Sequence, residues 1–213
     1  MHILSSLLLR TTEVGLIWNP AIPPSKSFMV WRLSQKMPTN ENLKLRGCSL
    51  PSMCTLCSKE AESADHLFLN CIFAMTLWNW LQSLINLNIN VSSFLSLFDI
   101  CNRGWSPQCK LVIISAIMNI LNTIWTCRNN LRFNGSKPRW NSIKALILAN
   151  VSLSGNFTKL ATGPSIRDFT ILKSFNVNTH HPNAPKIIEV IWSPPILHWT
   201  KCNTDGSALG SPG

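Results

Sequence analysis

Apolar residues recur along this chain at helical spacing, in runs separated by segments rich in proline, glycine and asparagine. The longest run, LVIISAIMNILNTIW, covers residues 111–125. A helix of this composition is apolar almost all round, which is typical of a buried core helix over residues 110–127. The polar residues in and just after the run form one narrow stripe on it: Ser115, Asn119, Asn122, Thr123 and Thr126.

Four further helices are predicted from the residues that bound them. Pro38 ends the first, because the residue before a proline is driven out of the helical region. Thr39 can cap the second through its hydroxyl, and Gly47 would terminate it. The third is a long apolar helix, and the fourth follows the core helix. The four cover residues 25–36, 40–46, 64–85 and 140–153.

Residues 174–195 are rich in asparagine, histidine and proline, lack a sustained period, and are predicted to be a linker. The chain then divides into an N-terminal lead, a first helical domain, a helical and basic extension, a linker, and a C-terminal strand and turn. These parts cover residues 1–17, 18–90, 91–173, 174–198 and 199–213. The expected fold class is mainly α, with an irregular linker and one incomplete β-strand and turn.

Charge is sparse but one-sided. Of 213 residues, 19 are Lys or Arg and 9 are Asp or Glu, giving a net charge of +10. Such a surplus favours polyanionic partners, nucleic acid first and membrane surfaces second. The apolar N-terminal stretch is too short for a signal peptide, and the longest apolar run is too short and too interrupted to span a bilayer. We expect an intracellular protein, nuclear or cytoplasmic, without a membrane partner.

The segment CTLCSKEAESADHLFLNC carries the clearest chemical pattern. Without a secretory signal, the eight cysteines of the chain should be reduced thiols or metal ligands. Cys54 and Cys57 have the C-x2-C spacing that places two thiolates on one ion, and His66 and Cys71 can close a tetrahedron. A closed Cys3His set predicts a structural Zn²⁺. The alternative is a chance grouping in a cysteine-rich chain.

Helix geometry restricts how the last two ligands can meet. His66 and Cys71 are five residues apart, which is about 140° of rotation on a straight α-helix. The predicted helix must therefore begin at His66, or bend before Cys71, for both side chains to reach the same ion. Asp65 is predicted to cap the helix that carries His66.

These residues and their neighbours resemble a known family. The segment from Trp18 to the ligands, and the run DHLFLNCIFAMTLWNWL after them, resemble the zinc-binding domain that follows the polymerase in plant non-LTR retrotransposon reverse transcriptases. Ile72 departs from the family, where proline is common. The segment IWTCRNNLRFNG resembles the tail of the same proteins. The matching features are Trp18, Pro24, Lys26, Phe28, Trp31-Arg32, Pro38-Thr39, Leu43, Arg46-Gly47, the four ligands, His66 to Phe68, Ala74 and Trp78.

The final segment, WTKCNTDGSALGSPG, resembles the opening strand and turn of a type-1 RNase H domain. The resemblance implies that Asp205 holds the position of the first catalytic carboxylate. A complete RNase H site uses several carboxylates around two divalent metals such as Mg²⁺. No other acid of this chain matches the pattern, so we expect Asp205 to be vestigial and the chain to lack ribonuclease activity. The chain would then be a fragment or the product of a decayed element.

Basic residues concentrate after the core helix. Residues 128–173 hold eight bases against one acid, Asp168. If the protein binds nucleic acid, this segment is the predicted phosphate-contacting surface. The alternative is a solvated basic face without a partner. The predicted contact residues are Arg128, Arg132, Lys137, Arg139 and Lys144.

Two functions follow from the resemblance and the charge. The first is a zinc-stapled helical module that binds RNA, DNA or their hybrid and assists the reverse transcriptase and RNase H parts of the same retroelement. The second is a structural connector that spaces those parts and binds nothing itself. A third outcome is a relic without a cellular function.

Overall fold

The computed structural model describes residues 17–34, 37–49, 51–182 and 196–200. These residues are mainly helical and contain no β-strand beyond one isolated bridge, which joins Met53 and Ala61. The mainly α prediction is therefore confirmed. The predicted C-terminal strand falls largely outside the described residues, and Trp199 and Thr200, which are described, are exposed and not part of a strand.

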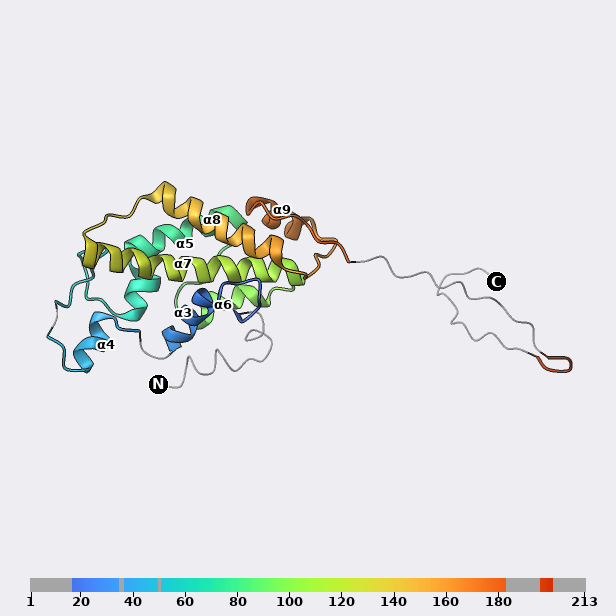
Figure 1. The fold of residues 1–213 in the computed structure, drawn as a ribbon, viewed down its shortest axis with the longest axis horizontal. Coiled ribbons are helices and arrows are strands. Elements are labelled where there is room, and N and C mark those ends of the chain that lie inside the picture. Colours follow the sequence, from blue (N-terminus) through green and yellow to red (C-terminus); the bar gives the residue numbers. More distant parts are fainter. Residues whose placement is uncertain (1–16, 35–36, 50, 183–195, 201–213) are drawn as a thin grey trace. The chain divides into compact units, whose positions relative to one another are not determined.

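Residues 1–182 form one compact unit, and residues 183–213 form a second. The helices of the first unit are shown in Figure 1. Among the described residues they are, in chain order, α3 (Pro24–Ser34), α4 (Asn40–Leu45), the π-helical turn η1 (His66–Asn70), α5 (Ile72–Ile85), α6 (Phe94–Phe98), the 3-10 turn η2 (Asp99–Asn102), α7 (Pro107–Asn134), α8 (Trp140–Phe157) and α9 (Ile166–Ser174).

Helix α7 is the centre of the unit. It packs against α3, α5, α8, α9 and both short turns, and α8 runs alongside it (Figure 1). All residues from 111 to 121 are buried, as predicted for the core helix. The helix is 28 residues long, which exceeds the predicted run and would suffice to cross a membrane by length and composition. However, 78% of its most apolar window is buried inside the protein, as in a core helix.

The other predicted helices are present with one important interruption. Helices α3, α4 and α8 lie where their sequence signals predict them. Thr39 caps α4 by accepting a hydrogen bond from the backbone of Asn42, and Gly47 follows the helix with a φ of +84°. The predicted helix over residues 64–85 is broken by the π-helical turn and by Cys71. Helices α6 and α9 were not predicted.

The end of the unit is fastened to the start of α7. Gln108 is fully buried, and its amide nitrogen donates hydrogen bonds to the backbone oxygens of Gly155 and Asn178 at 3.1 and 2.7 Å. Its amide oxygen accepts from the backbone nitrogen of His180 at 2.9 Å. The first residues of the predicted linker are therefore anchored to the core. The part of that linker over residues 183–195 lies outside the described residues.

Candidate metal centre

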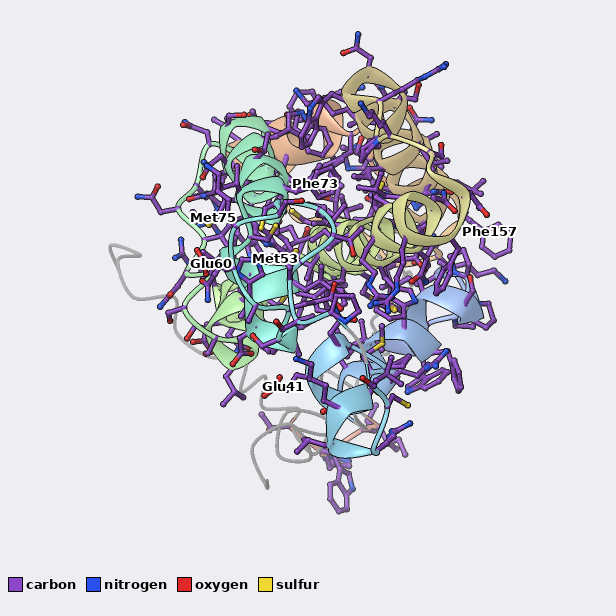
Figure 2. All side chains as sticks on the ribbon, turned by 90° about the vertical axis from the view of Figure 1, so that its left-hand side faces the viewer. Glu41, Met53, Glu60, Phe73, Met75 and Phe157 are labelled. Carbon is purple, nitrogen blue, oxygen red and sulfur yellow. The ribbon has the colours of Figure 1, made fainter. Side chains whose placement is uncertain are left out.

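The first two candidate ligands lie on a narrow loop. Around it, the backbone nitrogen of Cys54 donates to the oxygen of Glu60 at 2.8 Å, beside the Met53–Ala61 bridge. Figure 2 labels Met53 and Glu60, which belong to this loop. At its tip, the backbone nitrogen of Ser58 donates to the oxygen of Cys54 at 2.8 Å, and Ser58 has a φ of +53°. This turn brings Cys57 back over Cys54, as the C-x2-C spacing predicts.

The π-helical turn brings the other two ligands, His66 and Cys71, toward the same side of the chain. The backbone nitrogen of Cys71 donates to the oxygen of His66, five residues earlier, at 2.6 Å. A π-helical turn has more residues per turn and so rotates less per residue than an α-helix, which brings residues five apart closer to the same side. Cys71 then leaves the helical region, with φ −59° and ψ 137°. The bend predicted before Cys71 is therefore confirmed.

The cap of this segment differs from the prediction. Asp65 makes no side-chain capping hydrogen bond. Instead, the hydroxyl of Ser63 accepts a hydrogen bond from the backbone nitrogen of His66 at 3.0 Å. The prediction of Asp65 as the cap was wrong because residues 64 and 65 are already helical, which leaves the capping position to Ser63. The Ser63 contact places His66 at the start of its turn with the ring directed to the cysteines.

The four predicted ligands come together around one point. Cys57 Sγ lies 3.3 Å from His66 Nε2, and Cys54 Sγ lies 3.9 Å from Cys71 Sγ. All four ligand atoms lie within 4.8 Å of one another. A tetrahedral zinc with bonds of about 2.0–2.3 Å requires ligand atoms about 3.5–3.8 Å apart. The cluster therefore fits a structural Zn²⁺.

The donor set of three cysteines and one histidine is of the kind that binds structural zinc. The hydrogen bond between the two buried thiols, together with burial, raises the pKa of Cys54, whereas the same hydrogen bond lowers the pKa of Cys71. A bound Zn²⁺ takes thiolate ligands and releases their protons. Three thiolates and one imidazole leave no open position for water, so the ion would cross-link the chain and not activate a nucleophile.

Glu60 supplies a carboxylate behind the histidine ligand. His66 Nδ1 lies 3.1 Å from Glu60 Oε2, and it has no aligned hydrogen-bond partner among the described residues. His66 is buried, whereas 69% of the Glu60 side chain is exposed. A carboxylate behind a metal-bound imidazole fixes the ring orientation and makes the ligand more basic. Glu60 therefore fits the role of a residue that positions His66.

Replacing Glu60 by glutamine is expected to weaken zinc affinity by about tenfold, since loss of such a partner weakens metal affinity by about 10- to 100-fold. Competition with a chromophoric chelator measures the change. Asp65→Asn is the matched control, because Asp65 is also exposed and carries the same charge. If both variants lose the same affinity, net charge explains the effect and the Glu60 contact does not.

A buried ion pair holds the segment between the first and third ligands, residues 54–66 (the zinc loop), against α7. Glu62 lies between Cys57 and His66, and its two carboxylate oxygens accept hydrogen bonds from Arg128 Nε at 3.1 Å and Nη2 at 2.6 Å. Only 2% of the Arg128 side chain and none of the Glu62 side chain are exposed. Charge-assisted pairs of this bidentate kind fix geometry as well as distance. The zinc loop is therefore held against α7.

Asn40, the first residue of α4, extends this contact. Its backbone nitrogen donates to Glu62 Oε1 at 3.0 Å, and its side-chain nitrogen donates to the backbone oxygen of Met53 at 3.3 Å. Its side-chain oxygen accepts from Arg128 and from Arg132. One polar network thus joins α4 and the zinc loop to α7. Helix α4 and the zinc loop precede the domain boundary predicted at residue 90, and α7 follows it.

The basic residues predicted to contact nucleic acid do not share one surface. Arg128 is buried and paired with Glu62, so it cannot reach a phosphate, and we remove it from the predicted set. Arg132 is half-buried and donates to Asn40. Counting charges along the sequence could not separate these two arginines from exposed ones, because their partners lie far away in the chain.

The remaining three predicted residues lie near the start of α8. Lys137 and Arg139 are exposed and line a groove beside α7. Lys144 is half-buried on α8 and does not line that groove. Lys26 of α3 does line it, although this lysine lies more than 100 residues before the predicted basic segment.

The predicted vestigial carboxylate, Asp205, lies outside the described residues. The same holds for the rest of the RNase H-like segment from residue 201 onward. The RNase H resemblance, and the Mg²⁺ that a complete site would bind, therefore stay predictions.

Comparison with known proteins supports the zinc assignment. Residues 4–78 match the family model described as zinc-binding in reverse transcriptase. This segment covers about a third of the chain and contains all four ligands of the cluster. No curated protein and no solved structure matches the chain. The match supports the reverse transcriptase type of zinc-binding segment, whereas it does not test the plant and non-LTR origin.

Proposed function

We propose that this chain is a structural-zinc module of a retroelement reverse transcriptase that holds nucleic acid for the polymerase and RNase H parts of the same element. The observation that carries this proposal is the Cys3His cluster, whose four ligands all lie in the segment that matches the reverse transcriptase family model. Such a module would act in the nucleus or the cytoplasm.

The charge of the chain supports the nucleic-acid part of the proposal. The net charge is +10, and Lys137 and Arg139 are exposed. Phosphate contacts made by such residues release counterions and carry no base specificity. Binding should therefore be weak, independent of sequence and strongly dependent on salt.

We also propose that this chain is not an enzyme. A zinc ion with three thiolate ligands and one imidazole has no open position for a substrate or an activated water. The zinc centre would serve as a scaffold for the basic surface.

Titrating zinc-loaded protein into mixed-sequence RNA, DNA and RNA–DNA hybrid at rising salt tests both the proposed nucleic-acid binding and the proposed lack of enzymatic activity. We expect retention of all three, with affinity falling by about 0.7–0.9 log units per phosphate contact for each log unit of salt. With added Mg²⁺ the hybrid should be retained without being cleaved.

A charge-reversal variant tests whether the basic surface causes the retention of nucleic acid. Reversing Lys137 and Arg139 to glutamate should abolish retention while the zinc content stays at one per chain. Absence of any retention by wild-type protein at low salt would contradict the proposal and favour the structural connector. Cleavage that Asp205→Asn abolishes would contradict the non-enzymatic part.

A further inference from the structure

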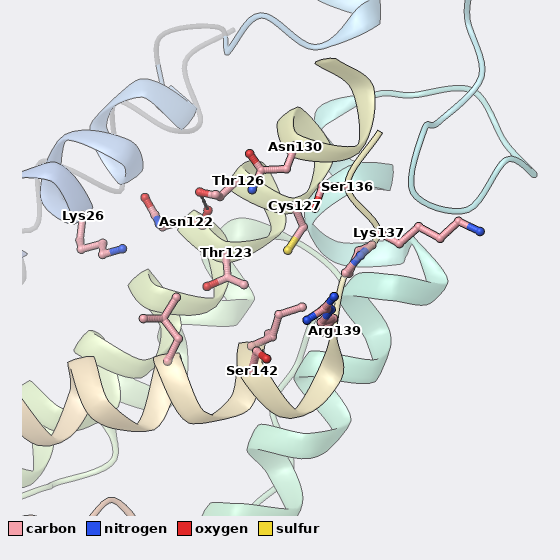
Figure 3. A pocket seen from close by; sticks show the side chains of 13 residues that line it. Lys26, Asn122, Thr123, Thr126, Cys127, Asn130, Ser136, Lys137, Arg139 and Ser142 are labelled. Atoms are coloured by element: carbon pink, nitrogen blue, oxygen red, sulfur yellow. Dashed lines mark hydrogen bonds between the residues drawn. The ribbon is translucent and has the colours of Figure 1, made fainter. Parts of the chain in front are cut away.

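A groove with a volume of about 870 Å³ lies between α3, α7 and the start of α8. Its floor is a polar stripe on α7 that includes Asn122, Thr126 and Asn130. Figure 3 shows Lys26 on one side of this stripe and Arg139 on the other, with Lys137 extending outward beyond Arg139. The groove thus brings together three segments that are separate in the sequence.

The charge of the lining has one sign. Lys26, Lys137 and Arg139 line the groove, and none of the described lining residues is Asp or Glu. Among the described acids, Glu62 and Asp168 are buried in hydrogen bonds elsewhere. A recess lined by cations concentrates its field on an anion that enters it.

Lys26 is the residue that distinguishes this groove from an ordinary basic face. It is half-buried, and its ammonium group has no hydrogen bond or ion pair with a described residue. Partial burial lowers the pKa of Lys26, because desolvation disfavours the charged form. An anion in the groove would compensate for the lost hydration of this ammonium group.

The floor is longer than one phosphate requires. Asn122 and Asn130 are eight residues apart on α7, which corresponds to about 12 Å at 1.5 Å per residue. A stacked strand advances about 3.4 Å per nucleotide, so the floor matches roughly three nucleotides. The side chains along it offer amide and hydroxyl groups that can bond to phosphate or sugar oxygens.

We propose that this groove binds the phosphodiester backbone of single-stranded nucleic acid, with Lys26 and Arg139 contacting phosphates from opposite sides. The proposal rests on the proposed function and adds the site and the form of the ligand. A positively charged groove that follows one backbone is the usual solution for binding a single strand without sequence preference. Lys137 at the rim contributes a further contact.

The test compares two double variants that remove the same charge. Lys26→Gln/Arg139→Gln changes the groove, whereas Lys159→Gln/Lys173→Gln changes exposed lysines outside it. The probe is a 12-nucleotide single strand of mixed sequence, as RNA and as DNA, measured by fluorescence anisotropy across a salt series. Zinc content and circular dichroism establish that both variants remain folded, and Lys26→Arg tests whether charge alone is needed at that position.

We expect the groove variant to lose about tenfold in affinity at 0.1 M salt and to flatten the slope of log affinity against log salt by about 1.4, or about 0.7 for each lost contact. The control variant should keep the wild-type slope, and Lys26→Arg should keep most of the affinity. Equal losses in both double variants would overturn the groove while leaving the proposed function intact.

Two further outcomes would overturn the proposal in other ways. Displacement of the strand by submillimolar inorganic pyrophosphate would indicate a site for an isolated phosphate. Equal affinity for a duplex of the same sequence would contradict the single-strand assignment. If wild-type protein binds no nucleic acid at low salt, the proposed function fails and the groove assignment fails with it.

Discussion

Substituting Cys57 by serine is expected to abolish stoichiometric zinc binding and to lower the melting temperature by more than about 10 °C. Structural zinc contributes about 10–16 kcal/mol to the folding of small zinc peptides, and a domain of this size loses about 2–4 °C per kcal/mol. The effect reaches the core because the turn between the ligands buries Leu67, Phe68 and Leu69 completely. Without the ion, the π-helical turn would lose the constraint that holds both its ends.

Cys48→Ser is the matched control, since Cys48 is an exposed thiol outside the cluster. Melting is followed by circular dichroism with and without a chelator. Wild-type protein and Cys48→Ser should both lose stability when the chelator is added, whereas Cys57→Ser should not respond to it. Unchanged melting of wild-type protein after complete removal of zinc would mean that the ion does not stabilise this fold.

Replacing Arg128 by methionine is expected to destabilise the protein by about 3–5 kcal/mol, because it leaves the Glu62 carboxylate buried without its cation. The carboxylate has no exposed surface, and the only contact that remains to it among those described comes from the backbone of Asn40. Glu62 lies within the zinc loop, so the variant should also release zinc more readily to a chelator. Denaturant unfolding measures the stability change.

Two variants separate the ion pair from simple loss of packing. Arg132→Met removes a half-buried arginine that also donates to Asn40, and it should cost about 1 kcal/mol, the net value of one hydrogen bond. Arg128→Met/Glu62→Leu removes both charges and should recover most of the stability. If the double variant is as unstable as Arg128→Met, the unpaired carboxylate is not the cause.

The metal site could be predicted because its ligands are close in sequence. Cys54 to Cys71 span 18 residues, and the spacing rules for structural zinc depend on short turns. The core helix could be predicted for a similar reason, since its pattern repeats within one segment. The π-helical turn was not predicted as such, but the angular conflict between His66 and Cys71 did show that the helix must bend.

Contacts between distant residues left no comparable signal. Glu62 and Arg128 are 66 residues apart, and each looks like an ordinary surface charge in the sequence. Arg128 was therefore predicted to contact phosphate, whereas in the structure it is buried and paired with Glu62. Lys26 was not predicted to line the basic groove, because only the packing of α3 against α7 brings it there.

Zinc-edge X-ray absorption on the purified protein tests the central claim most directly, together with metal analysis of the same sample. We predict one zinc per chain, with three sulfur atoms at about 2.3 Å and one nitrogen at about 2.0–2.1 Å. The sulfur count should fall by one in Cys57→Ser, if any zinc remains, and stay at three in Cys48→Ser. A metal-free protein that is fully folded, or a zinc shell made mainly of oxygen and nitrogen, would contradict the Cys54, Cys57, His66 and Cys71 centre.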